Sequence, residues 1–279
     1  MVPKKLVQDV VTRWNSTFYT IERFIDLEVS LRSTVALLDA TLPTLTMEEW
    51  SVLKELCKIL RPFETATCSV SDENYLSASL VIVVTNGLLD VCSELVNIAN
   101  LSDTSKIAIN KLENGLRERL GNVEYSNILA MCTFLDARFK TFGFKNADAV
   151  ERVRKNVISA VVGIIGNEEE KSKTVEEPDE ENVATNEKES TFSIWYSIDK
   201  AVTGCQKYTE NITAKALMEV QQYMEDDLLE RRKDPLQWWR DYNYMYPNLS
   251  KLVRQKCCAL GTSVPCKRLF SKAGNLLNE

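Results

Sequence analysis

The sequence predicts a mainly α-helical protein. Apolar residues recur at intervals of three and four along most of the 279 positions, which is the period of an amphipathic helix. Only nine glycines are present, and none form a glycine-rich phosphate loop, which disfavours a nucleotide-binding α/β fold. The content of 44% hydrophobic and 27% charged residues is typical of a soluble globular chain with enough apolar material for a core.

The first helix with clear boundary signals follows Thr46. The segment Thr46–Glu49 is a capping box, in which the Thr hydroxyl and the Glu carboxylate each bind a backbone amide of the first turn. Pro62 is expected to end this helix because it lacks the N–H that the helical ladder needs. The apolar face of the predicted helix contains Trp50, Leu53, Leu56, Cys57 and Leu60.

Further helices are predicted over 75–99 and 147–165, and a helix that Asp103 or Ser105 can cap lies between them. The run Leu80–Val84 taken alone could also form a strand. The last long amphipathic helix is predicted from Ile212 to Glu230, and its inward face is expected to contain Leu217, Val220, Met224 and Leu228.

Residues 167–190 interrupt the helical pattern. They contain ten acidic residues against three lysines, a local charge of −7, and two valines as their only aliphatic residues larger than alanine. Such a composition does not offset the entropy lost on ordering, so we predict a disordered linker. Two interpretations remain: the linker is a flexible insertion without a function, or it is an acidic mimic of DNA that shields a basic surface. The segment from Arg232 to Glu279 carries a local charge of +6.

Eight cysteines and no histidine limit the chemistry of the chain. No Cys-x-x-Cys pair occurs, so a zinc site is disfavoured, and catalytic triads that need histidine are excluded. Reduced, mostly buried cysteines in an intracellular protein are expected. Catalysis by carboxylates and a divalent metal is the one enzyme class that passes this test.

Four blocks of the chain share the order and spacing of a known family. Residues 9–18 read D-V-V-T-R-W-N-S-T-F, residues 61–67 read R-P-F-E-T-A-T, and residues 135–140 read L-D-A-R-F-K. The C-terminal block combines D-P-L-Q-W-W at 234–239, Y-P-N-L at 246–249 and T-S-V-P-C-K-R-L-F-S at 262–271. Together they resemble hAT-superfamily transposases and the host proteins derived from them, including those with BED-type zinc fingers.

The resemblance implies a helical insertion domain of an RNase-H-like transposase with only a C-terminal remnant of the RNase-H-like domain. The domains expected are an insertion-type domain over 1–166 that opens with the Arg-Trp block, an acidic linker over 167–190, further helices of the insertion over 191–231, and the hAT C-terminal dimerisation region over 232–279. Asp136 and Arg138 are expected to be structural, capping a helix and pairing within the insertion.

The resemblance also assigns candidate site residues. Arg13 and Trp14 take the places of an Arg-Trp pair near the active site, where the Trp can stack on an unpaired base at the transposon end. The alternative is that Trp14 is a core anchor with Arg13 salt-bridged beside it. The dimerisation residues expected are Trp238, Trp239, Tyr242, Tyr246, Leu249 and Phe270, as a self-association surface rather than a closed monomer core, or with one Trp in each.

The family's catalytic carboxylates are not matched. The third carboxylate is a Glu in the family, and Lys267 stands at that position and would repel a metal ion. The two Asp residues precede the Arg-Trp block in family members, and the chain begins at Met1, shortly before Asp9, so we expect neither these residues nor a BED finger, no cofactor and no metal.

The leading hypothesis is therefore a catalytically inactive, transposase-derived protein that dimerises with itself or with related hAT proteins. We expect weak or no DNA binding by the chain alone, no membrane association and, by resemblance, a nuclear location. The alternatives are a C-terminal fragment of an active DNA-cutting hAT transposase, and a helical adaptor that uses the aromatic surface for another partner.

Overall fold

The computed structural model describes residues 5–10, 14–37, 42–71, 77–173, 211–259 and 261. Every regular element within these ranges is a helix, which confirms the mainly α prediction. The chain divides into two compact units, one of Met1–Ser126 with Gly261–Glu279 and one of Asn127–Leu260. This division falls inside the segment 1–166 that was expected to be one domain, and the four-segment organisation stays a prediction.

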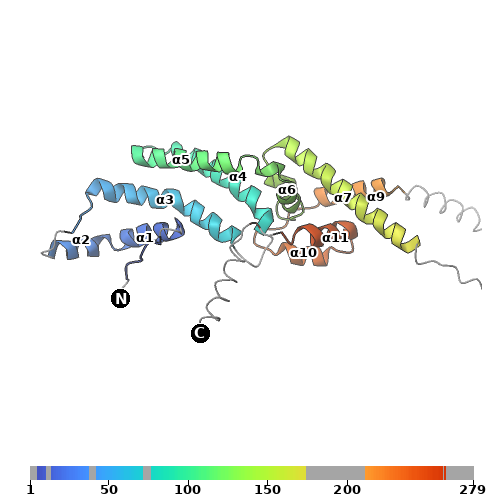
Figure 1. The fold of residues 1–279 in the computed structure, drawn as a ribbon, viewed down its shortest axis with the longest axis horizontal. Helices are drawn as coiled ribbons and strands as arrows, with labels where there is room; N and C mark the ends of the chain where they lie inside the picture. The colour runs from blue at the N-terminus through green and yellow to red at the C-terminus, as the bar shows by residue number, and fades with distance from the viewer. Residues whose placement is uncertain are drawn as a thin grey trace, which may run out of the picture. The chain divides into compact units, whose positions relative to one another are not determined.

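The first unit is built around the pair α3 (Met47–Val70) and α4 (Ser77–Val96). Helix α3 packs against α1, and both α3 and α4 pack against α5 (Figure 1). The core at this junction contains Ile59, Cys92 and Ile109. The remaining elements of the unit are α1 (Trp14–Asp26), α2 (Glu28–Leu37), α5 (Asp103–Leu120) and the short η1 (Val123–Tyr125).

The predicted N-cap is correct for α3 and wrong for α5. The capping box of α3 is confirmed, because the Glu49 amide donates to Thr46 Oγ1 at 3.2 Å and the Thr46 amide donates to Glu49 Oε2 at 2.7 Å. Helix α5 is capped by Ser102, whose Oγ accepts from the Ser105 amide at 3.3 Å, so the prediction of Asp103 or Ser105 as the cap was wrong. Ser102 Oγ itself donates to the Glu55 carboxylate of α3 at 2.6 Å.

The prediction that Pro62 ends a helix was wrong, because α3 continues through it to Val70. A proline inside a helix costs about 3 kcal/mol. Helix α3 packs along its length against α1, α4 and α5, and burial of side chains such as Trp50 and Ile59 at roughly 1.5–3 kcal/mol each offsets that cost. Pro62 therefore lies within a helix that tertiary packing maintains.

Residues Leu80–Val84, which could have formed a strand, lie inside helix α4. This helix is long and apolar enough to cross a membrane by length and composition alone. One such helix is weak support for a membrane span, because core helices of soluble proteins pass the same test. Helix α4 packs against α3 and α5, and Ala78, Ile82 and Cys92 are buried, while 22% of its most apolar window is buried.

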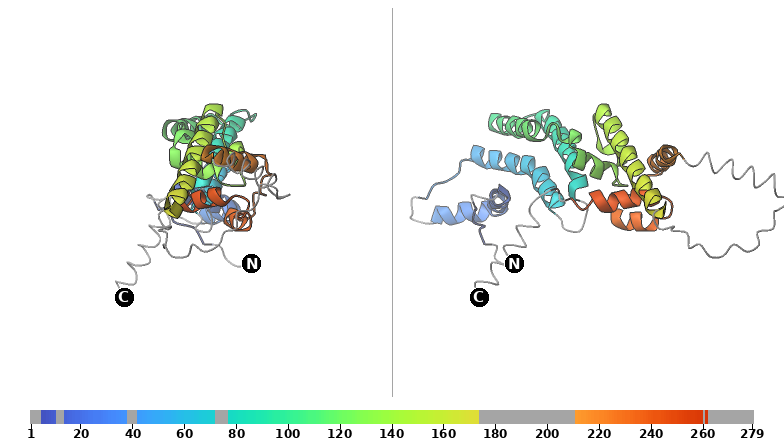
Figure 2. Two further views of the ribbon diagram at one scale, coloured as in Figure 1. Left: turned by 90° about the vertical axis from the view of Figure 1, so that its right-hand side faces the viewer. Right: turned by 45° about the vertical axis from the view of Figure 1, so that its right-hand side comes forward.

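The second unit contains α6 (Asn127–Phe134), η2 (Lys140–Gly143), α7 (Ala147–Lys173), α9 (Ile212–Glu225), α10 (Pro235–Asp241) and α11 (Pro247–Lys256). Helix α7 packs against α6, α9 and α11 (Figure 2). Of the cysteines that the structure describes, Cys57, Cys92, Cys132 and Cys257 are buried free thiols, and Cys68 and Cys258 are exposed free thiols.

Two predicted boundaries in this unit are corrected. Helix α7 extends to Lys173, so the first seven residues of the predicted linker are helical, and Glu168 of this extension accepts a hydrogen bond from Lys251 at 2.6 Å. The rest of the linker lies outside the described residues. Helix α9 ends at Glu225 rather than Glu230, and its buried face contains Ala216, Glu219, Val220 and Tyr223. Leu217 and Leu228, expected to point inward, are each 43% exposed.

Candidate functional site

The aromatic residues of the C-terminal block come together in the second unit. We define the aromatic cluster as Tyr223, Trp238, Trp239, Tyr242 and Tyr246. The rings of Trp238 and Tyr242 are stacked with centroids 4.5 Å apart, and the two indoles meet edge to face at 5.0 Å. Both geometries are favoured by the ring quadrupole.

The aromatic cluster is mostly core rather than surface. Trp238 is 9% exposed, Trp239 is 4% exposed and Tyr246 is fully buried, and Leu249 of α11 is also buried. Only Tyr242 retains partial exposure. The structure thus places these predicted dimerisation residues, with the exception of Tyr242, inside one protomer, and their role in dimerisation stays a prediction.

Hydrogen bonds join the aromatic cluster to the turn at 135–140, which is the L-D-A-R-F-K block. Trp239 Nε1 donates to the Leu135 carbonyl at 2.8 Å, and the Tyr223 hydroxyl donates to the Phe134 carbonyl at 3.0 Å. The Leu229 amide donates to the Ala137 carbonyl at 2.9 Å. Two blocks that are far apart in the sequence therefore form one structural core, in which the polar atoms of Tyr223 and Trp239 are satisfied.

A buried ion pair stabilises the turn at 135–140. Arg138 donates from Nε and Nη2 to the two carboxylate oxygens of Asp136, at 2.9 and 2.7 Å. The side chains are 6% and 0% exposed. Asp136 also accepts from the Arg138 amide at 3.1 Å, which closes a turn of the Asx type. The expected pairing of Asp136 with Arg138 is confirmed. The prediction that Asp136 caps a helix was wrong, because its hydrogen bond to the Arg138 amide closes a turn instead.

Lys140, at the end of the same block, is an unexpected buried cation. Its Nζ donates to the carbonyls of Tyr223 and Asp226, at 2.6 and 2.7 Å. These carbonyls lie at the C-terminal end of α9, where unpaired acceptors and the helix dipole favour a cation. Burial lowers the pKa of Lys140, and the negative charges of Asp226 and Asp227 act against this shift. The sequence carries no local signal for this contact, because donor and acceptors are more than 80 residues apart.

Replacing Lys140 by Met should lower the free energy of unfolding by about 2 kcal/mol, because the carbonyls at the end of α9 lose their donor. The measurement is urea unfolding followed by far-ultraviolet circular dichroism. Lys106→Met is the matched control, because the Lys106 side chain is 49% exposed and pairs with an exposed carboxylate; its effect should stay below about 0.5 kcal/mol. Equal effects of the two variants would contradict the structural role of Lys140.

Glu219 of α9 caps helix α11 from outside that helix. Its Oε1 accepts from the amides of Asn248 and Leu249 at 2.9 and 2.8 Å, and its Oε2 accepts from the Asn248 side chain at 2.8 Å. The carboxylate satisfies amides of the first turn and complements the helix dipole. A charged residue on the buried face of α9 was the one available signal for this contact.

The remaining predicted site residues are at the chain's two ends. Trp14, the first residue of α1, is 43% exposed. Asp9, which precedes α1, accepts hydrogen bonds from the hydroxyls of Ser16 and Thr17 at 2.7 and 3.0 Å. Arg13, Lys267 and Phe270 lie outside the described residues. Across the part of the chain that the structure describes, no three His, Cys, Asp or Glu side chains form a group that could hold a metal.

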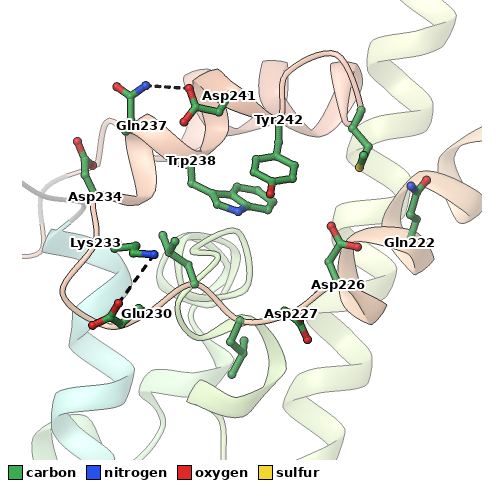
Figure 3. A pocket seen from close by; sticks show the side chains of 13 residues that line it. Gln222, Asp226, Asp227, Glu230, Lys233, Asp234, Gln237, Trp238, Asp241 and Tyr242 are labelled. Atoms are coloured by element: carbon green, nitrogen blue, oxygen red, sulfur yellow. Dashed lines mark hydrogen bonds and ion pairs between the residues drawn. The ribbon is translucent and has the colours of Figure 1, made fainter.

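A cavity of about 740 Å³ opens beside the aromatic cluster, between α10 and the loop that follows α9 (Figure 3). Its lining is rich in carboxylates and includes one aromatic stack. The lining residues are Gln222, Asp226, Asp227, Leu228, Leu229, Glu230, Lys233, Asp234, Gln237, Trp238, Asp241, Tyr242 and Met245.

Comparisons with known proteins match both ends of the chain. Residues 219–279 match the hAT family C-terminal dimerisation region, and residues 2–59 match the ZBED1 RNase-like helical domain. The chain is also similar to the human (Homo sapiens) zinc finger BED domain-containing protein 4, with 23% identity over 270 residues. This alignment covers 95% of the chain and 22% of that relative, so the chain spans about a fifth of the relative's length.

The two family matches contain the first and the last of the four blocks that carry the resemblance. The dimerisation match contains the aromatic cluster, Glu219 and the lining of the cavity, and the helical match contains Trp14 and the N-terminal half of α3. The chain is thus similar to the hAT C-terminal dimerisation region at one end and to a ZBED-type RNase-like helical domain at the other, which confirms its resemblance to transposase-derived proteins of the hAT superfamily.

Proposed function

We propose that this chain is a transposase-derived protein that has lost strand-transfer activity and retains dimerisation as its main function. The observation that carries the proposal is the match of residues 219–279 to the hAT dimerisation region. The partner is a second copy or a related hAT protein. A nuclear location is part of the proposal and is supported by the similarity to a BED zinc-finger protein.

The geometry supports separate interior and surface roles for the aromatic and apolar side chains of the matched region. The aromatic cluster forms a rigid interior, and apolar side chains of the same region reach solvent. Tyr244, in the turn between α10 and α11, is 78% exposed, and Leu236 on α10 is 37% exposed. Tyrosine is enriched at interface centres because it presents a large, stiff surface with a polar tip. We therefore place Tyr244 in the dimer contact, with the buried cluster supporting it.

Tyr244→Ala tests this placement. Truncating an aromatic anchor at an interface costs about 2 kcal/mol, which weakens dimerisation roughly thirtyfold. Sedimentation velocity over a concentration series gives the dissociation constant. Phe142→Ala is the matched control, since Phe142 is also 78% exposed and lies in the same unit but outside the matched region. An unchanged constant for Tyr244→Ala, or an equal change for both variants, would contradict the proposed contact.

Weak DNA association through Trp14 is a further part of the proposal. The exposed part of its indole at the start of α1 is available to stack on an unpaired base, a contact worth roughly 1–3 kcal/mol. A duplex with a short single-stranded end should quench tryptophan fluorescence, and Trp14→Ala should abolish the part of the quenching that saturates. Saturable quenching that survives in Trp14→Ala would exclude this contact.

Absence of catalysis by the chain alone rests on Lys267, which places a cation where the family has a metal-binding carboxylate. The purified chain should neither cut nor join DNA ends with Mg²⁺ or Mn²⁺, and Lys267→Glu should not restore activity because one carboxylate does not form a two-metal site. Nicking that a chelator abolishes would contradict this.

A second candidate function is that of a segment of a longer, active DNA-cutting transposase. It is favoured by one observation, that the chain corresponds to 22% of the length of its relative. Genomic sequence upstream of Met1 that encodes two aspartates and a Cys-x-x-His block in the same reading frame would support this candidate. A stop codon close to Met1 in that frame would exclude it.

A further inference from the structure

The cavity beside α10 belongs entirely to the second unit, because all its lining residues fall between Gln222 and Met245. Its volume of about 740 Å³ is in the range of binding sites for small molecules and peptide side chains. One wall is the stack of Trp238 on Tyr242 at 4.5 Å, and the facing wall is the loop 226–230. The loop is positioned by the contacts of Lys140 and by the Leu229–Ala137 hydrogen bond.

The charge of the lining is strongly negative. Five carboxylates face one ammonium group, that of Lys233, which gives a local charge of −4. The Lys233 ammonium lies 3.9 Å from Glu230, and both side chains are well exposed. The carboxylates are those of Asp226, Asp227, Glu230, Asp234 and Asp241.

These carboxylates keep acceptor capacity for a ligand. Asp234 uses Oδ1 for the Leu236 amide at 2.8 Å, and Asp241 uses Oδ1 for the Gln237 side chain at 2.8 Å. Asp226 accepts from the Tyr246 hydroxyl through one oxygen. A carboxylate has about four acceptor positions, so donors from a ligand can still be accommodated.

An unpaired donor also faces the cavity. Trp238 is 9% exposed, its ring stacks with those of Tyr242 and Tyr246, and its nitrogen edge is turned toward the cavity in Figure 3. Its indole N–H has no acceptor among the described residues. By contrast, the N–H of Trp239 donates to Leu135 at 2.8 Å. The described residues' enclosed polar side-chain atoms that lack a partner do not include this nitrogen, so the N–H is open to the cavity and can donate to an acceptor that enters it.

We propose that this cavity binds a basic peptide segment of a partner protein, with an Arg or Lys side chain among the carboxylates and a peptide carbonyl accepting from Trp238 Nε1. The carboxylates favour a cationic donor, and the indole N–H beside them can donate to an acceptor. A peptide with a basic side chain provides both groups a few ångströms apart. An anion would be repelled by the lining, and a bare metal ion would leave the indole unpaired.

The binding test uses the full chain and a short end-capped peptide of Gly and Ser with a single Arg. Isothermal titration should give saturable binding that weakens as salt is raised, because exposed charges are screened. The matched probe carries citrulline in place of Arg, which keeps the shape and removes the charge. We expect no measurable binding of the citrulline peptide at the same concentrations.

Variants then locate the site. Asp227→Asn and Asp241→Asn should each weaken binding about fivefold, the upper range for an exposed ion pair. Trp238→Phe should weaken it by a similar factor, since an aromatic ring is kept and the indole N–H is lost. Asp148→Asn is the charge-matched control, because Asp148 is an exposed carboxylate of α7 outside the cavity. It should leave the affinity unchanged.

The outcomes separate this proposal from dimerisation. Binding that Asp227→Asn weakens and Asp148→Asn does not supports the cavity, whatever the effect of Tyr244→Ala on the oligomeric state. Equal binding of the Arg and citrulline peptides overturns the proposal, as does equal weakening by the Asp148 and Asp227 variants. Binding absent from the dimer and also from the Tyr244→Ala monomer overturns it as well. If the second copy occupies the cavity in the dimer, the peptide should bind only to the monomeric Tyr244→Ala variant. That result would overturn the assignment of the cavity to a different partner protein.

Discussion

Trp239→Ala is expected to lower the free energy of unfolding by about 3–5 kcal/mol, the usual cost of deleting a buried large aromatic side chain. The side chain is 4% exposed, packs on Tyr223 at 5.2 Å and donates its N–H to the Leu135 carbonyl at 2.8 Å. The substitution removes packing against Tyr223 and leaves a buried carbonyl without its donor. Both losses fall on the contact between the C-terminal block and the turn at 135–140.

Urea unfolding followed by circular dichroism measures this effect, with Phe142→Ala as the control. Phe142 is an aromatic residue of the same unit that is 78% exposed, so its removal should change stability by less than about 0.5 kcal/mol. Wild-type stability of Trp239→Ala together with a shift to monomer would show that Trp239 lies at an interface. That result would contradict its burial within one protomer.

Asp136→Asn is expected to destabilise the second unit by about 3 kcal/mol, because it removes the negative charge that pairs with the buried guanidinium of Arg138. The asparagine retains the shape and one acceptor, so the loss of stability measures the contribution of the negative charge. The pair is almost fully shielded from water, with side chains 6% and 0% exposed, and screening by salt should therefore change the effect little.

Asp103→Asn provides the comparison for this prediction. Asp103 pairs with Lys106 at 3.2 Å, and its side chain is 94% exposed, so breaking this pair should cost less than about 0.5 kcal/mol. Thermal unfolding of the two variants in low and high salt measures the difference. Similar small shifts for both would show that the Asp136–Arg138 pair is accessible to water.

Local features of the fold could be predicted from the sequence, and features set by distant contacts could not. The capping box at Thr46 is complete within four residues and forms as predicted. The prediction at Pro62 used an equally local rule, and packing of α3 against three other helices overrides it. The carbonyls at the C-terminal end of α9 bind Lys140, which is far away in the sequence.

The candidate site shows the same division. The spacing of the C-terminal block identified Trp238, Trp239 and Tyr246 as a group, and the structure brings them together. Their burial could not be deduced, because periodicity does not distinguish a core from an interface. Glu219 and Lys140 were missed because their partners belong to other elements, and a charged residue in a helical pattern is normally solvent-exposed.

The most direct test of the central claim is the mass of the wild-type chain by sedimentation equilibrium at micromolar concentration. The chain has a mass of 31.7 kDa. If residues 219–279 act as a dimerisation region, the fitted mass of the wild type should rise with concentration toward twice the monomer mass. The fitted mass of Tyr244→Ala should remain near the monomer mass. A wild-type mass that stays at 31.7 kDa across the micromolar range would contradict dimerisation as the function that this chain retains.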